Sequence, residues 1–225
     1  MPSYLAAPEG GARGAVVVIQ EAFGVTSHIE DVCRRFADSG WWALAPALFH
    51  RQGSPVLAYD DFSAVMPIMR RLTAEGIAAD LDGAFAYAEG CGYNSAQTAI
   101  VGFCMGGTVA LFAGTARPLG AAVSFYGGGV VEGRFGMASL VELAPGLRSP
   151  WLGLYGDLDK GIPVEQVEAL RAAAAEASVP TEVLRYPDAD HGFHCDDRPA
   201  VYNAAAAKDA WERTLAWLED HAAEP

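Results

Sequence analysis

Short apolar runs alternate along the chain with longer segments in which apolar residues recur at helical spacing. The apolar runs, each short enough for one strand, lie at residues 15–19, 42–45, 98–101, 121–126, 151–155 and 181–186. The first of them, from Ala15 to Ile19, is apolar at every position, as in a strand that is covered on both faces. This pattern predicts a buried, mostly parallel sheet.

Helical spacing separates the predicted strands. Segments with apolar residues three or four positions apart lie at residues 27–39, 62–72, 77–89, 163–177 and 200–221. In the first segment, Ser27 is placed to cap a helix and Gly40 to end it. The last segment should bury a face that includes Trp211, Leu215 and Leu218.

The order of strands and helices predicts how the chain is organised. No proline- or serine-rich linker and no internal repeat divides it. We therefore predict a single α/β domain, residues 1–225, with helices on both faces of the sheet. Residues 48–73 are irregular and are placed to form a small cap or entrance wall. In such sheets, ligands bind beyond the carboxyl ends of the strands.

The most informative strand end is the turn that follows residues 98–101. It reads Gly102-x-Cys104-x-Gly106, in which the two glycines leave room for a central residue with a strained backbone. Serine usually stands at the centre of such a turn, so here a thiol replaces a hydroxyl. The amino end of the following helix favours a thiolate. Cys104 is thus a candidate nucleophile; the alternative is a buried, inert cysteine packed between glycines.

Three other strand ends carry groups that can assist a thiol. Glu21 follows the first predicted strand, Asp157 and Asp159 follow the fifth, and His191 follows the sixth. A thiol nucleophile needs a base, and a histidine base needs a carboxylate that orients it. The order nucleophile, acid, histidine is that of the α/β-hydrolases.

Together these motifs make the sequence similar to the dienelactone hydrolase family, which has the α/β-hydrolase fold and a cysteine nucleophile. The matching segments, in the same order, are Gln20-Glu21-Ala22-Phe23-Gly24, Gly102-Phe103-Cys104-Met105-Gly106-Gly107, Gly156 to Asp159 followed by Ile162-Pro163, and His191-Gly192-Phe193. The resemblance implies a carboxymethylenebutenolidase-like hydrolase of small carboxylic esters or lactones. It further implies an acyl-thioester intermediate and no metal or organic cofactor.

The resemblance also implies a catalytic role for individual residues. Cys104, His191 and Asp159 are expected to form the triad, and Asp157 is the alternative acid. In the family, the glutamate at the position of Glu21 contacts the cysteine and takes its proton when substrate binds. The alternative for Glu21 is an ordinary surface acid near a helix end.

Substrate contacts and the oxyanion hole are also implied. The backbone N–H groups of Ala22 and Met105 are expected to hold the oxyanion. The family binds a carboxylate-bearing dienelactone through two arginines, the first of which has no clear counterpart here. Arg198 lies near the position of the second but is displaced along the loop, and its alternative role is to anchor the last helix. Side chains expected to contact substrate are Phe23, Tyr126, Phe193 and Arg198.

Composition bears on partners and location. The net charge of -13 argues against a nucleic-acid partner. The four cysteines include no Cys-x-x-Cys pair, so neither a zinc site nor a disulfide framework is indicated. Residues 1–10 lack the pattern of a secretion signal, and no apolar run reaches the roughly eighteen residues that span a membrane. We expect a soluble, cytoplasmic protein that binds no membrane and, by the family resemblance, a monomer.

Two other functions are compatible with the same motifs. The first is a non-catalytic thiol sensor or ligand-binding scaffold, in which Cys104 is oxidised or binds without turnover. The second is a thioesterase or peptidase that uses the same triad. The late start of the first long strand, at Ala15, leaves room for one short edge strand at residues 3–6 and so predicts a smaller sheet than is usual for the fold.

Overall fold

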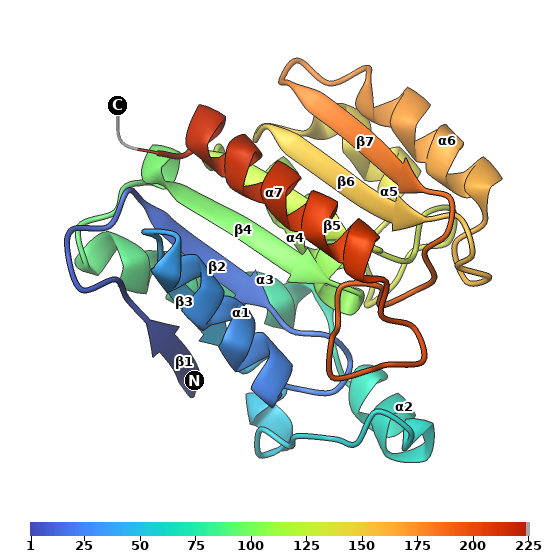
Figure 1. Ribbon diagram of the computed structural model, residues 1–225, viewed down its shortest axis with the longest axis horizontal. Helices are drawn as coiled ribbons and strands as arrows, with labels where there is room; N and C mark the ends of the chain where they lie inside the picture. Colours follow the sequence, from blue (N-terminus) through green and yellow to red (C-terminus); the bar gives the residue numbers. More distant parts are fainter. Residues whose placement is uncertain (224–225) are drawn as a thin grey trace.

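The strands form one sheet in the computed structural model, which describes residues 1–223 (Figure 1). The sheet has seven strands in the order β1-β3-β2-β4-β5-β6-β7. The edge strand β1 runs antiparallel to β3, and the other neighbouring pairs are parallel. The strands are β1 Ser3–Ala6, β2 Ala15–Ile19, β3 Trp42–Pro46, β4 Thr98–Phe103, β5 Ala121–Phe125, β6 Trp151–Gly156 and β7 Thr181–Tyr186. The predicted α/β class and the predicted edge strand are confirmed.

Helices cover both faces of this sheet. They are α1 Ser27–Asp38, α2 Phe62–Met69, α3 Ala74–Gly90, α4 Met105–Ala116, α5 Leu140–Leu143, α6 Val164–Ala174 and α7 Ala204–His221, with short 3-10 helices at His50–Gln52, Ser95–Gln97 and Ala144–Gly146. Helices α1 and α7 lie in front of the sheet in Figure 1, and α3 to α6 pack on the opposite face. Within residues 1–223, no helix has the length and apolar composition needed to cross a bilayer.

Strand β2 shows why its residues are apolar at every position. Val17 and Ile19 pack into the core under α3 and α4, whereas Val16 and Val18 pack into the core under α1 and α7. All four side chains are fully buried. Burial of each aliphatic side chain stabilises the fold by about 1.5–3 kcal/mol. A strand with one face in water would bury only every second side chain and so would contribute about half as much.

Helix ends and faces differ in detail from the sequence prediction. The cap of α1 is Thr26, whose side-chain oxygen accepts a hydrogen bond from the Ile29 N–H, while Ser27 is the first helical residue. In α7, Trp211 and Leu215 are only partly buried, because the helix approaches the sheet through small residues such as Ala210. Helix α5 was not predicted, since four residues are too few to show a periodic pattern.

The irregular segment 48–73 lies over the loop that follows β2. Its helix α2 buries Val65 against Ala22 and Phe23 of that loop. The start of the segment is fixed to α3, since His50 and Arg51 both bind the buried carboxylate of Asp80, at 3.0 and 2.7 Å. The segment thus lies beside the carboxyl end of β2. The loops that follow the other parallel strands lie at the same end of the sheet.

Candidate active site

Cys104 occupies a sharp turn between β4 and α4. Its backbone has a positive φ of 55° with ψ −116°, a strained combination for a residue with a side chain, and its side chain is partly exposed. A Cβ atom on Gly102 would overlap the carbonyl oxygen of Gly106, and one on Gly106 would overlap the end of β2. These two glycines therefore allow β4 to turn directly into α4. The turn leaves the thiol at the amino end of a 12-residue helix, where the helix dipole favours negative charge.

His191 and Asp159 are brought together from the loops after β7 and β6. The His191 Nδ1 lies 2.6 Å from Asp159 Oδ2, and Asp159 is 5% exposed. The second carboxylate oxygen of Asp159 accepts a hydrogen bond from the Gly161 N–H at 2.8 Å. Burial acts to lower the pKa of His191, but Cys104 and Asp159 outweigh it and raise that pKa well above its usual value. The imidazole thus lies between a thiol and a carboxylate.

Asp157, the alternative acid, faces a different partner. Its two carboxylate oxygens each accept a hydrogen bond at 2.7 Å from Arg185 on β7. The same guanidinium also binds Glu168 of α6. Of the two aspartates after β6, Asp159 is the one that contacts His191.

Glu21 is a buried carboxylate at the end of β2. It is 1% exposed, and neither carboxylate oxygen has a hydrogen-bond partner among residues 1–223. The nearest ion-pair contact is with Arg198 Nη1, at 3.9 Å. Burial raises the pKa of Glu21, while His28, Arg198 and His191 act in the opposite direction. This environment differs from that of a surface acid.

Two backbone N–H groups are free beside the thiol turn. Met105 is the first residue of α4, and the first N–H groups of a helix have no acceptor within it. Ala22 lies in the turn after β2, and its N–H donates to no other group of the chain within residues 1–223. Among residues 1–223, neither N–H has a backbone acceptor outside the helices and strands.

Arg198 lies against aromatic rings beside Glu21. Its guanidinium carbon is 5.5 Å from the ring centres of both Phe23 and Tyr59, and its side chain is 17% exposed. A Cβ on Gly192 would come within 2.6 Å of its Nη1, so glycine at that position leaves room for the guanidinium. Arg198 therefore lies beside Glu21 and against the rings of Phe23 and Tyr59.

The two remaining predicted substrate contacts are buried. Tyr126 is fully buried with its ring 5.0 Å from that of His191, and burial and Glu21 raise its pKa well above the usual value. Phe193 is also fully buried, and its ring packs against Tyr126 and Tyr186. Phe193 is therefore a core residue, and we do not place it in contact with substrate.

Sequence reasoning missed several buried polar groups near the site. Tyr59 donates a hydrogen bond to Thr26 at 3.2 Å, and the thiol of Cys195 lies 3.7 Å from the Tyr59 hydroxyl. Burial, and next Glu21, raise the pKa of Cys195 to about 12. No local motif marks Tyr59 or Cys195, because the two residues meet only where the irregular segment 48–73 contacts the loop after β7.

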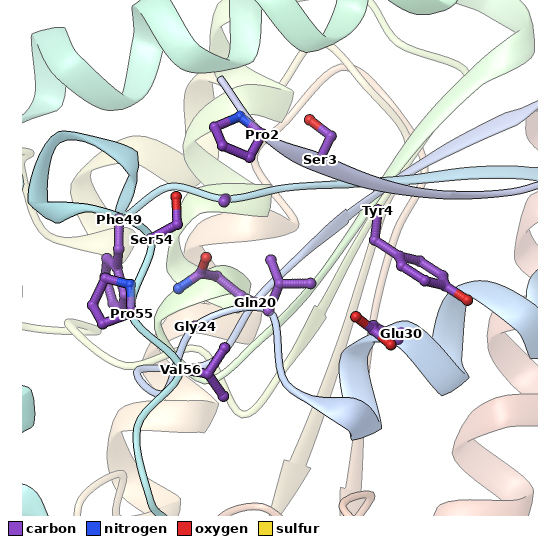
Figure 2. Close-up of a pocket in the computed structure, with 12 residues that line it drawn as sticks. Pro2, Ser3, Tyr4, Gln20, Gly24, Glu30, Phe49, Ser54, Pro55 and Val56 are labelled. Carbon is purple, nitrogen blue, oxygen red and sulfur yellow. The ribbon is translucent and has the colours of Figure 1, made fainter.

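A separate cavity lies behind the loop that carries Glu21. It has a volume of about 210 Å³ and is bordered by Tyr4, Gln20, Phe49 and Val56, among others (Figure 2). The Gln20 amide is already used, because it accepts a hydrogen bond from the Leu48 N–H and donates one to the Glu21 carbonyl. None of the candidate catalytic residues lines this cavity. Among residues 1–223, no cluster of three or more histidine, cysteine or acidic side chains is arranged to hold a metal ion.

Comparison with known proteins identifies the family. The model of the dienelactone hydrolase family matches residues 1–222. A protein of Salmonella typhimurium named "Putative carboxymethylenebutenolidase" is 40% identical to this chain, over 98% of the chain and 83% of the relative. The chain belongs to the dienelactone hydrolase family. It is accordingly an enzyme, a carboxylic ester hydrolase related to carboxymethylenebutenolidases, and the non-catalytic alternative is set aside.

Solved structures of dienelactone hydrolases show the same fold. The crystal structure of a "Putative Dienelactone Hydrolase" from Klebsiella pneumoniae superimposes with a TM-score of 0.90 at 39% identity, covering 98% of this chain and 93% of that one. A dienelactone hydrolase-like promiscuous phosphotriesterase from metagenomic libraries superimposes with a TM-score of 0.74 at 28% identity, covering 95% and 88%. The predicted α/β-hydrolase fold is thereby confirmed.

Proposed function

We propose that this dienelactone hydrolase family member cleaves small carboxylic esters or lactones with Cys104 as the nucleophile. The observation that carries the proposal is the contact series from Cys104 through His191 to Asp159, supplied by the ends of β4, β7 and β6. The partly exposed thiol is open to a ligand, whereas the carboxylate that orients the imidazole is shielded from water. A thiol, a base and an orienting acid are the parts that acyl transfer requires.

The proposed reaction has two halves. The Cys104 thiol gives its proton to Glu21, and its sulfur attacks the ester carbonyl carbon to form a tetrahedral oxyanion. The N–H groups of Ala22 and Met105 donate hydrogen bonds to that oxyanion. The intermediate collapses, the carbon–oxygen bond to the alcohol breaks, and protonated His191 gives the leaving alkoxide a proton. His191 then takes a proton from water, whose oxygen attacks the thioester carbon. The carbon–sulfur bond breaks, the acid leaves, and Glu21 returns its proton to the sulfur of Cys104.

Glu21 is proposed to accept the thiol proton when substrate enters. Its buried carboxylate has no hydrogen-bond partner in the described chain, and burial already raises its pKa and so its affinity for a proton. A substrate group that draws Arg198 away would remove one of the neighbours that lower the pKa of Glu21. Proton uptake by Glu21 would then leave a thiolate on Cys104 only when substrate is bound.

The proposed thiolate chemistry also indicates the cellular location and the binding partner of the enzyme. A thiolate nucleophile works only while its cysteine is reduced, and the four cysteines are unpaired. We therefore place the enzyme in the cytoplasm, where thiols stay reduced. Its partner there is a small-molecule ester or lactone, bound without a cofactor by a single copy of the chain.

The test is release of 4-nitrophenol from 4-nitrophenyl acetate, followed with mass spectrometry of the intact protein. We expect wild type to show a burst and to gain one acetyl group, which Cys104→Ala abolishes. His191→Ala should lower the acylation rate about a hundredfold or more, because the charged imidazole that stabilises the thiolate of Cys104 is lost. Asp159→Asn should also lower it.

Two matched control variants test whether the loss of the burst is specific to the proposed catalytic residues. Asp157→Asn changes the aspartate that binds Arg185, and Cys195→Ser changes the other thiol near the site; both should retain the burst. Equal rates in wild type, Cys104→Ala and His191→Ala would exclude the proposed nucleophile and base.

A further inference from the structure

A buried histidine–carboxylate pair joins α1 to the loop after β7. The Nδ1 of His28, in the first turn of α1, lies 3.0 Å from Asp196 Oδ1. The side chain of His28 is fully buried, whereas that of Asp196 is 37% exposed. The reaction proposed above gives this pair no role, although a histidine that is removed from water beside a carboxylate is an arrangement typical of functional sites.

Asp196 fixes which nitrogen of His28 carries a proton. Burial acts to raise the pKa of Asp196, but its ion pair with Arg35 outweighs burial and lowers that pKa. An ionised carboxylate can only accept hydrogen bonds, so the Nδ1 of His28 is the donor in this contact. A second proton, on Nε2, therefore makes the ring a cation.

The Nε2 of His28 and both carboxylate oxygens of Glu21 share one property. Each of these atoms is buried and has no hydrogen-bond partner among residues 1–223. The ring of His28 packs against that of Phe103, the residue before Cys104, with ring centres 6.3 Å apart. Strand β4, which ends at Phe103, is paired with β2, and Glu21 follows the end of β2. His28 and Glu21 therefore lie at the same two strand ends.

Several titratable groups face Glu21, and His28 has the largest electrostatic effect among them. Burial raises the pKa of Glu21, and of the charges that oppose burial His28 acts more strongly than Arg198, whose Nη1 lies 3.9 Å from the carboxylate. The groups around this carboxyl are His28 of α1, Tyr59 of the irregular segment, Tyr126 after β5, and His191, Cys195 and Arg198 after β7.

A neighbouring histidine separates the effect of charge from that of packing. The ring of His194 is buried, and its centre lies 5.7 Å from that of His28. Burial, and next His28, lower the pKa of His194 to about 3. The ring of His194 is therefore neutral near neutral pH. Of these two packed imidazoles, His28 is the one that can carry a charge beside Glu21.

We propose that His28 is a positioning residue that keeps the carboxylate of Glu21 ionised until it accepts the thiol proton. Asp196 fixes the proton on Nδ1, and the proton on Nε2 places a positive charge beside the buried carboxylate. While His28 holds this second proton, Glu21 is free to take the proton of Cys104. The inference rests on the proposed ester hydrolysis at Cys104 and gives His28 no contact with substrate.

The first test is the pH dependence of kcat/KM for 4-nitrophenyl acetate. His28→Asn puts an amide N–H at the position of Nδ1, so it keeps a donor for Asp196 and removes the charge. Burial then makes Glu21 bind a proton at higher pH. We expect kcat/KM to be several-fold below wild type at about pH 6 and equal to it at about pH 8, where a histidine is mostly neutral. His194→Asn is the matched control and should follow the wild-type profile.

The second test depends neither on turnover nor on a variant of His28. Heteronuclear NMR of the histidine rings shows which ring nitrogens carry a proton. In wild type, both nitrogens of His28 should be protonated at about pH 6. In Glu21→Gln, the Nε2 of His28 should lose its proton at a lower pH than in wild type, because the coupling between two titrating groups is reciprocal.

The outcomes separate this proposal from the proposed reaction. If His28→Asn lowers kcat/KM by the same factor at every pH, or if the Nε2 proton of His28 titrates equally in wild type and Glu21→Gln, the role of His28 is overturned while ester hydrolysis stands. If turnover does not depend on Cys104, the proposed function is refuted, and the NMR comparison still decides whether His28 and Glu21 are coupled. The same comparison decides the question if His28→Asn does not fold. A loss confined to low pH, together with the reciprocal NMR shift, supports the proposal.

Discussion

At Cys104, one residue combines a backbone conformation typical of glycine with a side chain that glycine lacks. A non-glycine residue at φ 55° costs of order 1 kcal/mol or more, and the surrounding packing has to maintain it. Tyr126, which is close to the same site, also has a positive φ, of 40°. Glu21 adds a different cost, because it is a buried carboxylate without hydrogen bonds. Destabilised residues thus gather around the proposed nucleophile.

The burial of Glu21 predicts how stability depends on pH. Because its pKa is raised in the folded protein, the folded state binds this proton more tightly than the unfolded state, whose carboxyl titrates near 4.5. Stability from this group is therefore present at low pH and is lost as pH rises from about 4.5 through the raised pKa. We expect the free energy of unfolding of Glu21→Gln, relative to that of wild type, to increase between about pH 5 and pH 8, as measured by urea unfolding.

The control for this measurement is Glu9→Gln, which removes an exposed carboxyl between β1 and β2. The free energy of unfolding of Glu9→Gln should change between about pH 5 and pH 8 by about the same amount as that of wild type. If Glu21→Gln and wild type lose the same stability over this range, the carboxyl of Glu21 titrates normally in the folded protein.

Among the elements, β4 and α4 depend on each other more closely than any pattern of apolar residues requires. The strand passes into the helix at Cys104 without a loop, because Gly102 and Gly106 are in backbone contact. Ser124 of β5 adds a hydrogen bond from its hydroxyl to the carbonyl of Gly107, at 2.7 Å. The amino end of α4 is thereby fixed against two strands, and the thiol turn cannot move without them.

Replacing a glycine of this turn should therefore destabilise the whole fold. In Gly102→Ala, the new Cβ would overlap the Gly106 carbonyl, and we expect a loss of about 3 kcal/mol or more in the free energy of unfolding. Gly83→Ala is the matched control, because Gly83 lies within α3 with no atom within 4 Å of a new Cβ. It should gain about 0.5–1 kcal/mol, since alanine favours a helix. Chemical denaturation measures both, and equal stability of the two variants would contradict this account.

Across the whole molecule, the loop that carries His191 and Arg198 is fixed by α1. Asp196 of this loop forms an ion pair with Arg35 and lies 3.0 Å from the Nδ1 of His28, both on α1. Burial opposes ionisation of Asp196, but Arg35 outweighs it and lowers the pKa of this carboxyl. Contacts between α1, near the start of the chain, and this loop, near its end, thus fix the loop that carries His191.

We expect Asp196→Asn to loosen this loop. The free energy of unfolding should fall by only about 1 kcal/mol, because the ion pair that is lost is partly exposed to water. The kcat/KM for an activated ester should fall several-fold, because His191 becomes less well placed. Hydrogen exchange should accelerate in residues 192–203. Asp31→Asn is the control, since Asp31 pairs with Arg34 and Arg35 within α1 and does not reach the loop. Unchanged exchange in Asp196→Asn would show that α1 does not hold the loop.

The sequence by itself determined the layered fold and the order of chemical groups along the strand ends. Both depend on local rules: the buried strand at Ala15–Ile19 is apolar throughout, and the turn at Cys104 needs glycines at fixed spacing. The family resemblance favoured Asp159 over Asp157, and tertiary structure supplies the physical reason that Asp157 faces elsewhere: Arg185, 28 residues away, binds it. Tertiary structure also decided that Phe193 belongs to the core. Such contacts join residues far apart in the chain, and no periodicity or spacing records them.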